Sequence, residues 1–149
     1  MFFRLDSFAL IGIEAIRVSI EVHISRGLPG LHIVGLPGQA VSESRQRVRS
    51  AILNSGFEFP VRKIILNLSP ADIKKDGSLY DLPIALSILA ASGQLGEKNL
   101  KDCCFIGELS LDGWINLVRG LISMVEKAQK MGKKYFFVPD RNKDQAHMF

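Results

Sequence analysis

The sequence contains few of the residues that would indicate a disulfide-bonded scaffold or a metal site. Its 149 residues include two cysteines, Cys103 and Cys104, and three histidines. Adjacent cysteines rarely bridge each other, and they offer no metal-ligand spacing. The histidines are scattered, without a partner at ligand spacing: His23, His32 and His147. We therefore expect no metal, and we interpret the cysteine pair as two small core residues of a strand, which fits a reducing cytoplasm.

Long apolar runs and targeting signals are also missing. No stretch reaches the roughly 18–20 apolar residues that are needed to cross a membrane. The first residues, Met1–Asp6, do not combine a basic lead with an apolar stretch, so they do not form a secretory signal. Neither the P-loop pattern nor the dinucleotide-binding glycine pattern occurs, so no nucleotide cofactor is expected for this chain. These absences predict a cytoplasmic protein without a membrane partner.

Length and composition are those of one globular domain. A chain of 149 residues can bury a real core, and 47% hydrophobic with 23% charged residues is an ordinary balance. The formal net charge of +4 permits nucleic acid as a partner without requiring it. We predict a single domain over residues 1–140, with residues 141–149 beginning a linker or a further element.

The order of the hydrophobic patterns predicts an α+β fold with a mixed sheet covered by helices on one face. Apolar and polar residues alternate from Val18 to Ile24, which is typical of a half-buried strand. Helical patterns cover Gln39–Asn54 and Leu121–Met131, and Asp112-Gly113 predicts a hairpin turn. Further strands are expected within residues 5–16, 31–36, 64–68, 103–106 and 135–138. We interpret the two Gly-Leu-Pro-Gly copies, residues 27–30 and 35–38, as hairpin turns.

The stretch from Ser69 to Leu86 has the most distinctive pattern of the chain. Its polar loop, which contains Lys74, Lys75 and Gly77, leads directly into a helix that is apolar on all sides and is therefore expected to be buried. Asp81 is placed to cap this helix by accepting the free N–H groups of its first turn. A charged loop at the start of a buried helix is a common way to build an active site.

Seven basic residues fall within about thirty positions and are candidates for one basic surface. Lysine and arginine neutralise phosphates without reading sequence, so such a surface would bind DNA through its backbone. The alternative, a solvated charged helix face, is about equally consistent with the pattern. The candidates for DNA binding are Arg45, Arg47, Arg49, Arg62, Lys63, Lys74 and Lys75.

Several motifs between about residues 60 and 145 resemble the proteolytic domain of the Lon-type proteases. They are Lys75-Asp76-Gly77 with the apolar helix after it, the segments 107–113 and 120–121, and Phe137-Val138-Pro139. The resemblance implies a serine two residues after Gly77 and an activating lysine two residues after Gly120. Leu79 and Ile122 stand at these positions, so we expect no catalytic residue in this chain. Ser78 lies one residue away from the nucleophile position.

Nearly the whole chain resembles the N-terminal Lon-like domain of the magnesium-chelatase-like AAA+ ATPases, the YifB/ComM family. The resemblance rests on the Leu-Ile-Gly-Ile-Glu opening, the paired Gly-Leu-Pro turns, the Glu43–Arg49 helix, Asn67–Asp72 and Tyr80–Leu86. It implies a ribosomal protein S5 domain 2-like fold that precedes an ATPase module in the chain. ATP and Mg²⁺ would then bind only to that module, whose P-loop is absent from these residues.

The resemblance implies a non-catalytic domain that binds DNA independently of sequence and helps to assemble a hexameric ring with other protomers. Its pathway would be DNA processing, namely branch migration during natural transformation. A protein–protein interaction module without nucleic-acid contact is the alternative, and it would be favoured by an exposed apolar patch together with arginines committed to intramolecular pairs. An active Ser–Lys peptidase is the third reading, which Leu79 and Ile122 disfavour.

Overall fold

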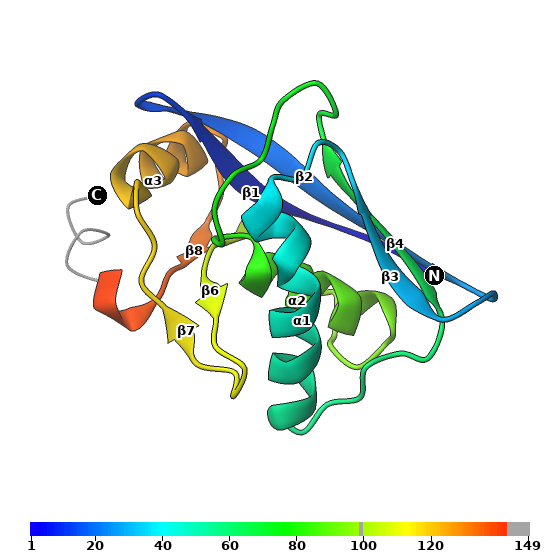
Figure 1. The fold of residues 1–149 in the computed structure, drawn as a ribbon. Helices are drawn as coiled ribbons and strands as arrows, with labels where there is room; N and C mark the ends of the chain where they lie inside the picture. Colours follow the sequence, from blue (N-terminus) through cyan, green and yellow to red (C-terminus); the bar gives the residue numbers. More distant parts are fainter. Residues whose placement is uncertain (99, 143–149) are drawn as a thin grey trace.

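The computed structural model describes residues 1–98 and 100–142, and the predicted linker residues 143–149, with His147, lie outside the described part. The chain forms eight strands, three α-helices and two short 3-10 helices within that part (Figure 1). Their bounds are β1 Phe2–Ile11, β2 Glu14–Ser25, β3 Gly30–Val34, α1 Gln39–Asn54, β4 Lys63–Ser69, α2 Asp81–Ala91, η1 Leu100–Asp102, β5 Cys103–Phe105, β6 Glu108–Leu109, β7 Ile115–Asn116, α3 Leu121–Lys130, β8 Tyr135–Phe137 and η2 Asp140–Asn142.

A six-stranded mixed sheet organises the domain in the order β3-β4-β2-β1-β5-β8. The β1–β2 hairpin and the β2–β4 pair are antiparallel, whereas β3–β4, β1–β5 and β5–β8 are parallel. The predicted mixed sheet is therefore confirmed. The prediction of two Gly-Leu-Pro-Gly hairpins is wrong, because β4 pairs between β2 and β3, and the second copy leads into α1 instead of a strand.

Two hydrophobic cores lie on opposite faces of the β1–β2 hairpin. Side chains alternate along a strand, so Leu5 and Ile20, which are register partners, point to the face opposite Phe8. Leu5 and Ile20 belong to the main core, which is completed by α1 and α2, while Phe8 belongs to a second core with Met124 of α3. Helices α1 and α2 thus cover one face of the sheet. Helix α3 packs on the opposite face, near the turn of the β1–β2 hairpin. The prediction of helices on one face holds for α1 and α2 only, because the pattern along β1 places apolar side chains on both of its faces.

The helix that follows the charged loop is buried, as predicted. Nine of the eleven residues of α2 are buried, and they include the polar side chains of Asp81 and Ser87. Ser87 Oγ donates to the Pro83 carbonyl, 2.7 Å away, so its hydroxyl has a partner within the helix. Helix α2 packs against β1 and β2 and lies beside α1, so it is the element against which the basic helix is fixed (Figure 1).

The end of the described chain is attached to the domain. Asn142 is fully buried, its Nδ2 donates to the Val118 carbonyl at 3.0 Å, and its Oδ1 accepts from the Val118 N–H at 3.1 Å. The described chain is thus packed against the domain up to its last described residue. No described helix has the length and apolar character that a membrane span requires.

Candidate nucleic-acid interface

Helix α1 presents its arginines on two different sides. Its buried stripe contains Val41, Ser44 and Val48, which recur at the three- and four-residue spacing of one helix face. Arg45 and Arg49 lie on the exposed side, whereas Arg47 is only partly exposed. Arg47 therefore lies on a different side of the helix from Arg45 and Arg49, although the three are close together in the sequence.

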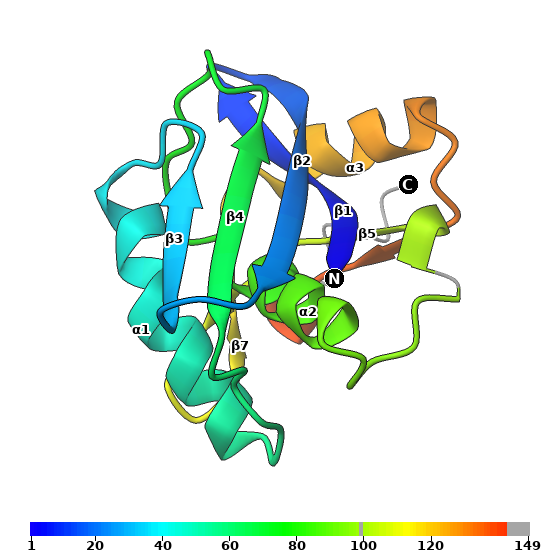
Figure 2. The same ribbon diagram turned by 90° about the vertical axis from the view of Figure 1, so that its right-hand side faces the viewer.

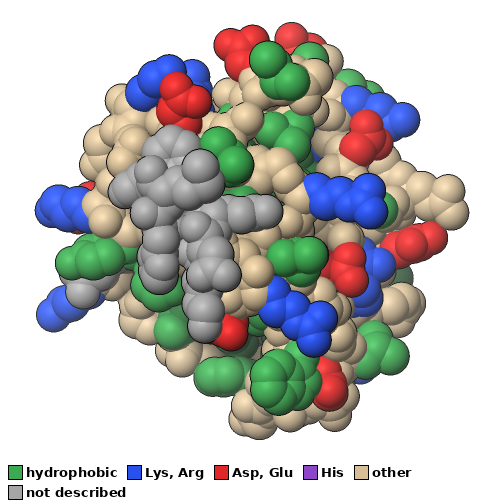
Figure 3. All heavy atoms as spheres, turned by 90° about the vertical axis from the view of Figure 1, so that its left-hand side faces the viewer, with side chains coloured by type: hydrophobic (Ala, Val, Ile, Leu, Met, Phe, Trp, Pro, Cys, Tyr) green, Lys and Arg blue, Asp and Glu red, His purple; other side chains and the backbone are tan. Residues whose placement is uncertain are grey.

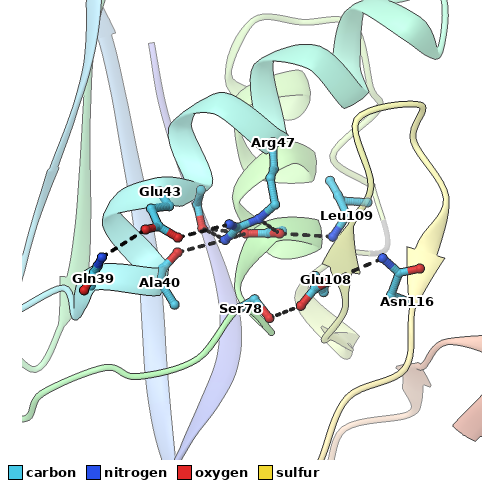
Figure 4. A network of polar contacts seen from close by, with 10 residues as sticks. Gln39, Ala40, Glu43, Arg47, Ser78, Glu108, Leu109 and Asn116 are labelled. Atoms are coloured by element: carbon cyan, nitrogen blue, oxygen red, sulfur yellow. Dashed lines mark hydrogen bonds and ion pairs between the residues drawn. The ribbon is translucent and has the colours of Figure 1, made fainter.

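A buried carboxylate joins α1 to α2 and to the β6 strand (Figure 4). Asp81 is completely buried, and its Oδ1 accepts from Ser44 Oγ at 2.5 Å. Arg47 donates to both of its oxygens, from Nε at 2.6 Å and from Nη2 at 3.1 Å. The Leu109 N–H donates to Oδ2 at 3.0 Å. Four donor contacts from two other elements thus satisfy one carboxylate inside the protein.

The prediction that Asp81 caps α2 is wrong. Tyr80 occupies the N-cap position, and no side chain makes a capping hydrogen bond there. Asp81 is the first helical residue, and its carboxylate turns toward α1 instead of toward the N–H groups of its own helix. Its negative charge still lies at the positive end of the helix dipole, which is a favourable place for it.

Arg47 is committed to contacts inside the domain. Besides Asp81, it donates to the Ala40 carbonyl at 2.8 Å and lies 3.9 Å from a carboxylate oxygen of Glu43. The hydrogen bond to Asp81 is the main reason that the pKa of Arg47 is raised above its ordinary value. We therefore remove Arg47 from the set of side chains that are available to a ligand.

Lys75 is also removed from that set because it is fully buried. Its Nζ donates to the Gly35 carbonyl at 2.8 Å and to the Pro70 carbonyl. Burial lowers the pKa of Lys75 below its ordinary value. The lysine fastens the loop before α2 to the loop before α1, which also form a backbone bridge at Pro37 and Lys75. Lys74 is exposed and lies 3.8 Å from Asp76.

Two of the remaining basic candidates line a groove between α1 and the β3 edge of the sheet. Arg45 and Arg49 line this groove together with Phe59 and His32. The Arg49 guanidinium lies 5.2 Å from the centre of the Phe59 ring, a distance that suits a cation–π contact. Arg62 is exposed beside it, and its carbonyl accepts from the N–H of Gly30, a residue of the groove wall. Lys63 follows Arg62 as the first residue of β4.

The arginines in and beside this groove, and Lys63 at the start of β4, are not neutralised by acidic partners among the described residues. Within residues 1–98 and 100–142, no ion pair involves Arg45, Arg49, Arg62 or Lys63. Figure 3 shows a different face of the molecule, on which acidic and basic side chains are interspersed. The groove is therefore a local surplus of positive charge, which attracts anions.

The positions that correspond to the Lon Ser–Lys dyad hold apolar side chains in this fold. Leu79 is partly buried and packs against both cores, and Ile122 is exposed near the start of α3. Ser78, the neighbouring hydroxyl, donates to Glu108 Oε2 (Figure 4). Glu108 also accepts from Asn116 Nδ2 at 3.4 Å. Ser78 is therefore paired with a carboxylate, whereas the lysine that would activate a Lon-type serine is replaced by Ile122.

Sequence reasoning missed three participants in these arrangements. Ser44 and Glu108 gave no signal, because their partners are 37 and 30 residues away in the chain. Phe59 was passed over, since it follows the helix by several residues and only the fold returns it to α1. No three histidine, cysteine or carboxylate side chains come together as a metal site in the described residues.

The mixed sheet, the buried α2 and the segments at Leu79 and Ile122 define a Lon-like domain. This agrees with similarity to a Lon protease of Mycolicibacterium smegmatis, which is 25% identical over 140 residues, covering 90% of this chain and 18% of that protease. A model of the family "Subunit ChlI of Mg-chelatase" matches residues 20–142. The chain belongs to this magnesium-chelatase-like family.

Two relatives within the family are similar along nearly the whole chain. YifB of Escherichia coli, described as an uncharacterized protein, is 50% identical over 138 residues, which cover 93% of this chain and 27% of YifB. The competence protein ComM of Haemophilus influenzae is 44% identical over 142 residues, covering 95% of this chain and 28% of ComM. The chain thus spans roughly a quarter of the length of these relatives.

Proposed function

We propose that this chain is the DNA-binding, non-catalytic N-terminal domain of a ComM/YifB-type magnesium-chelatase-like AAA+ ATPase. The observation that carries the proposal is the α1–β3 groove, which Arg45 and Arg49 line. These two arginines, the neighbouring Arg62 and Lys63 at the start of β4 have no ion-pair partner among the described residues. The other basic candidates on α1 and its neighbouring loop, Arg47 and Lys75, are used to hold the elements that form the groove.

Phosphates are the ligand that this groove suits best. Each cation that neutralises a phosphate releases counterions, so the binding energy is electrostatic and independent of sequence. The Arg49–Phe59 contact orders one guanidinium at the groove, which reduces the entropy lost when it meets a phosphate. The groove lies on a regular helix and beside a sheet edge, so its charges are held on rigid elements.

The role in the longer protein follows from the family context. We propose that the domain holds DNA next to an ATPase module that binds ATP and Mg²⁺, in a cytoplasmic ring of several protomers. The name of one relative, a competence protein, agrees with a role in DNA processing such as branch migration during natural transformation. Leu79 and Ile122 support the non-catalytic part of the proposal, since neither side chain can attack a peptide or activate a hydroxyl.

A salt titration of DNA binding by the 149-residue chain tests the proposal. The wild-type chain is expected to bind single-stranded, duplex and branched DNA with an affinity that falls steeply as salt rises. Replacing Arg45 and Arg49 with glutamine should flatten the slope of log K against log salt by about two, because each phosphate contact contributes roughly 0.9 for duplex DNA.

The matched control replaces Lys127 and Lys130 with glutamine, which removes the same charge from another helix, α3. This variant should keep the slope of the wild type. Equal slopes for both variants would mean that binding depends on net charge alone and would contradict the groove. Absence of any salt-dependent binding by the wild type would reject the proposal.

A second candidate function is a protein–protein interaction module. The β6–β7 hairpin exposes apolar side chains, with Trp114 at 74% and Leu111 at 56% exposure. Leu53 and Phe57 at the end of α1 are also exposed. The hairpin adjoins that end at Gly113, where an added Cβ would lie 2.4 Å from Ser55 Oγ. If Trp114→Ser abolished ring assembly of the full-length protein while DNA binding by the groove was absent, this candidate would replace the first.

A further inference from the structure

On the sheet face opposite α1 and α2, α3 packs only near the β1–β2 hairpin end, and no described helix covers β3, β4 or the other end of β2. Figure 2 views this side of the molecule, with these strands nearest the viewer and α1 behind them. The side chains that point away from α1 and α2 alternate with the core residues, as the strand period requires. His23, His32 and Phe2 on this face are exposed, and Ile65 is partly exposed.

These four side chains form one row across four strands. The register pairs Phe2 of β1 with His23 of β2, His23 with Ile65 of β4, and Ile65 with His32 of β3. Register partners point to the same face of a sheet, and neighbouring strands are about 4.8 Å apart. The row therefore places three flat rings and one aliphatic side chain along a line of roughly 14 Å.

We call these four residues the ring row. We propose that the ring row is a stacking surface for the bases of a single-stranded nucleic acid. An aromatic or imidazole ring on an open sheet can stack on an unpaired base of any sequence. A base pair inside a duplex offers no free face, so the row discriminates in favour of single strands. The inference rests on the proposed function, because the α1–β3 groove supplies the phosphate contacts.

The groove and the ring row meet at His32. This residue lines the groove beside Arg45 and Arg49, and it is also the β3 member of the row. A strand whose phosphates lie in the groove can therefore pass over the sheet edge and lay its bases on the open face. β3 is the edge strand of the sheet, so no further described strand blocks this path.

The charges beside the row favour a polyanion over an acidic or neutral partner. Both carboxylates that β1 and β2 place on this face are already paired: Glu21 with Arg4 at 2.7 Å, and Asp6 with Arg17 and Lys133 at 2.8 and 2.6 Å. Lys63 adds a cation at the β4 end of the face without an ion-pair partner in the described chain. The Arg4 guanidinium lies 5.7 Å from the Phe2 ring centre, so a cation accompanies the last ring of the row.

The test compares a ring-deletion variant, Phe2→Leu with His23→Gln, which leaves the groove residue His32 in place, against a control that removes exposed rings elsewhere, Trp114→Leu with Tyr135→Leu. The probes are poly(dT) and a mixed-sequence duplex of equal length. Stacking on aromatic rings makes a large contribution per base, so we expect the ring-deletion variant to bind poly(dT) about tenfold more weakly. Its duplex affinity and the affinity of the control variant for both probes should change less than about twofold.

Photo-crosslinking gives a second readout that needs no variant. A single strand containing bromodeoxyuridine, irradiated with the wild-type chain, should crosslink to Phe2, His23 or His32, as identified by mass spectrometry. Crosslinks confined to other surfaces would overturn the inference even if the ring-deletion variant did not fold.

The outcomes separate this inference from the proposed function. The groove substitutions could weaken salt-dependent binding while the ring deletion leaves it unchanged. That result would reject the ring row and support the groove. Loss of self-association instead of poly(dT) binding in the ring-deletion variant would show that the open face packs against a second copy. No DNA binding by the wild-type chain would reject both proposals.

Discussion

Arg47 of α1 and Asp81 of α2 form a two-point ion pair, with Nε 2.6 Å from Oδ2 and Nη2 3.1 Å from Oδ1. The carboxylate is completely buried and is also held by Ser44 and the Leu109 N–H. A two-point pair of this kind fixes the relative orientation of the two side chains and also contributes electrostatic attraction. It fixes the basic helix to the buried helix, so the position of the groove arginines depends on a residue that no ligand reaches.

Breaking this pair should destabilise the domain strongly. Asp81→Ala leaves a partly buried guanidinium without its partner, and we expect a loss of about 3 kcal/mol in the free energy of unfolding. Arg47→Ala leaves the fully buried Asp81 carboxylate without its cationic partner, and the free energy of unfolding should fall by at least as much. Urea denaturation of both single variants and of the double variant measures the coupling, which should exceed about 1 kcal/mol.

Glu43→Gln is the control for that cycle. Glu43 lies 3.9 Å from Arg47, and its side chain is 57% exposed. Exposed pairs of this kind contribute little, so the expected loss is below about 0.5 kcal/mol. Additive effects of the Asp81 and Arg47 substitutions would show that the two side chains act independently, contrary to the geometry.

Gly35 should tolerate alanine much less well than Gly12, although both have positive φ angles of 97° and 63°. A Cβ on Gly35 would lie 2.2 Å from the Leu68 carbonyl oxygen, whereas a Cβ on Gly12 would meet no atom within 4 Å. Gly12→Ala should therefore cost only the backbone penalty of about 1–2 kcal/mol. Gly35→Ala should cost at least about 3 kcal/mol, because the loop must also shift.

The melting temperatures of these two glycine variants provide the measurement, with the wild type in the same scans. The Gly35 carbonyl accepts from Lys75 Nζ, so a shifted loop should also disturb that buried lysine. Equal destabilisation at the two glycines would show that the loop before α1 has more freedom than its contacts indicate.

The domain should lose stability as the pH rises above 9. Burial raises the pKa of Cys104 from 9.0 to about 12, and burial also raises the pKa of Cys103. A raised folded-state pKa means that the folded protein holds the proton more tightly than the unfolded chain. The contribution is therefore complete below pH 9 and is lost progressively between pH 9 and 12.

Urea midpoints measured across this pH range test the prediction, with Cys104→Ala as the comparison. The variant lacks the titrating thiol, so its stability should decline less between pH 9 and 12 than that of the wild type. If the stabilities of the wild type and the variant declined equally, the loss of stability would come from groups other than Cys104. Alkylation of both thiols in the folded protein should also be slow, because the thiolate is the reactive form.

A fluorophosphonate probe should leave Ser78 unlabelled. Its hydroxyl donates to the Glu108 carboxylate, and the position two residues after Gly77 is occupied by Leu79. Gel fluorescence, with an active serine hydrolase in a parallel reaction, gives the readout. Labelling of the wild-type chain that disappears in Ser78→Ala would overturn the interpretation that this Lon-like site is inactive.

Local patterns in the sequence were sufficient for most of the elements. Alternation from Val18 to Ile24 identified β2, helical spacing identified α1, and Asp112-Gly113 identified the β6–β7 turn. These features depend on neighbours within about four residues, where the period of apolar side chains is decisive. The same reasoning failed for the Gly-Leu-Pro-Gly segments, because a turn sequence does not specify which strand will pair beside it.

The candidate site divides in the same way. The sequence by itself determined that basic residues concentrate around α1 and that Leu79 and Ile122 replace the dyad of the Lon-type proteases. Only the tertiary structure decided which basic side chains are free to contact a ligand. Arg47 is bonded to Asp81, and Lys75 donates to two backbone carbonyls. Arg45 and Arg49 remain available, with Arg49 beside Phe59. The physical reason is that a charge takes the partner the fold brings within about 3 Å, and those partners lie up to 40 residues away in the chain.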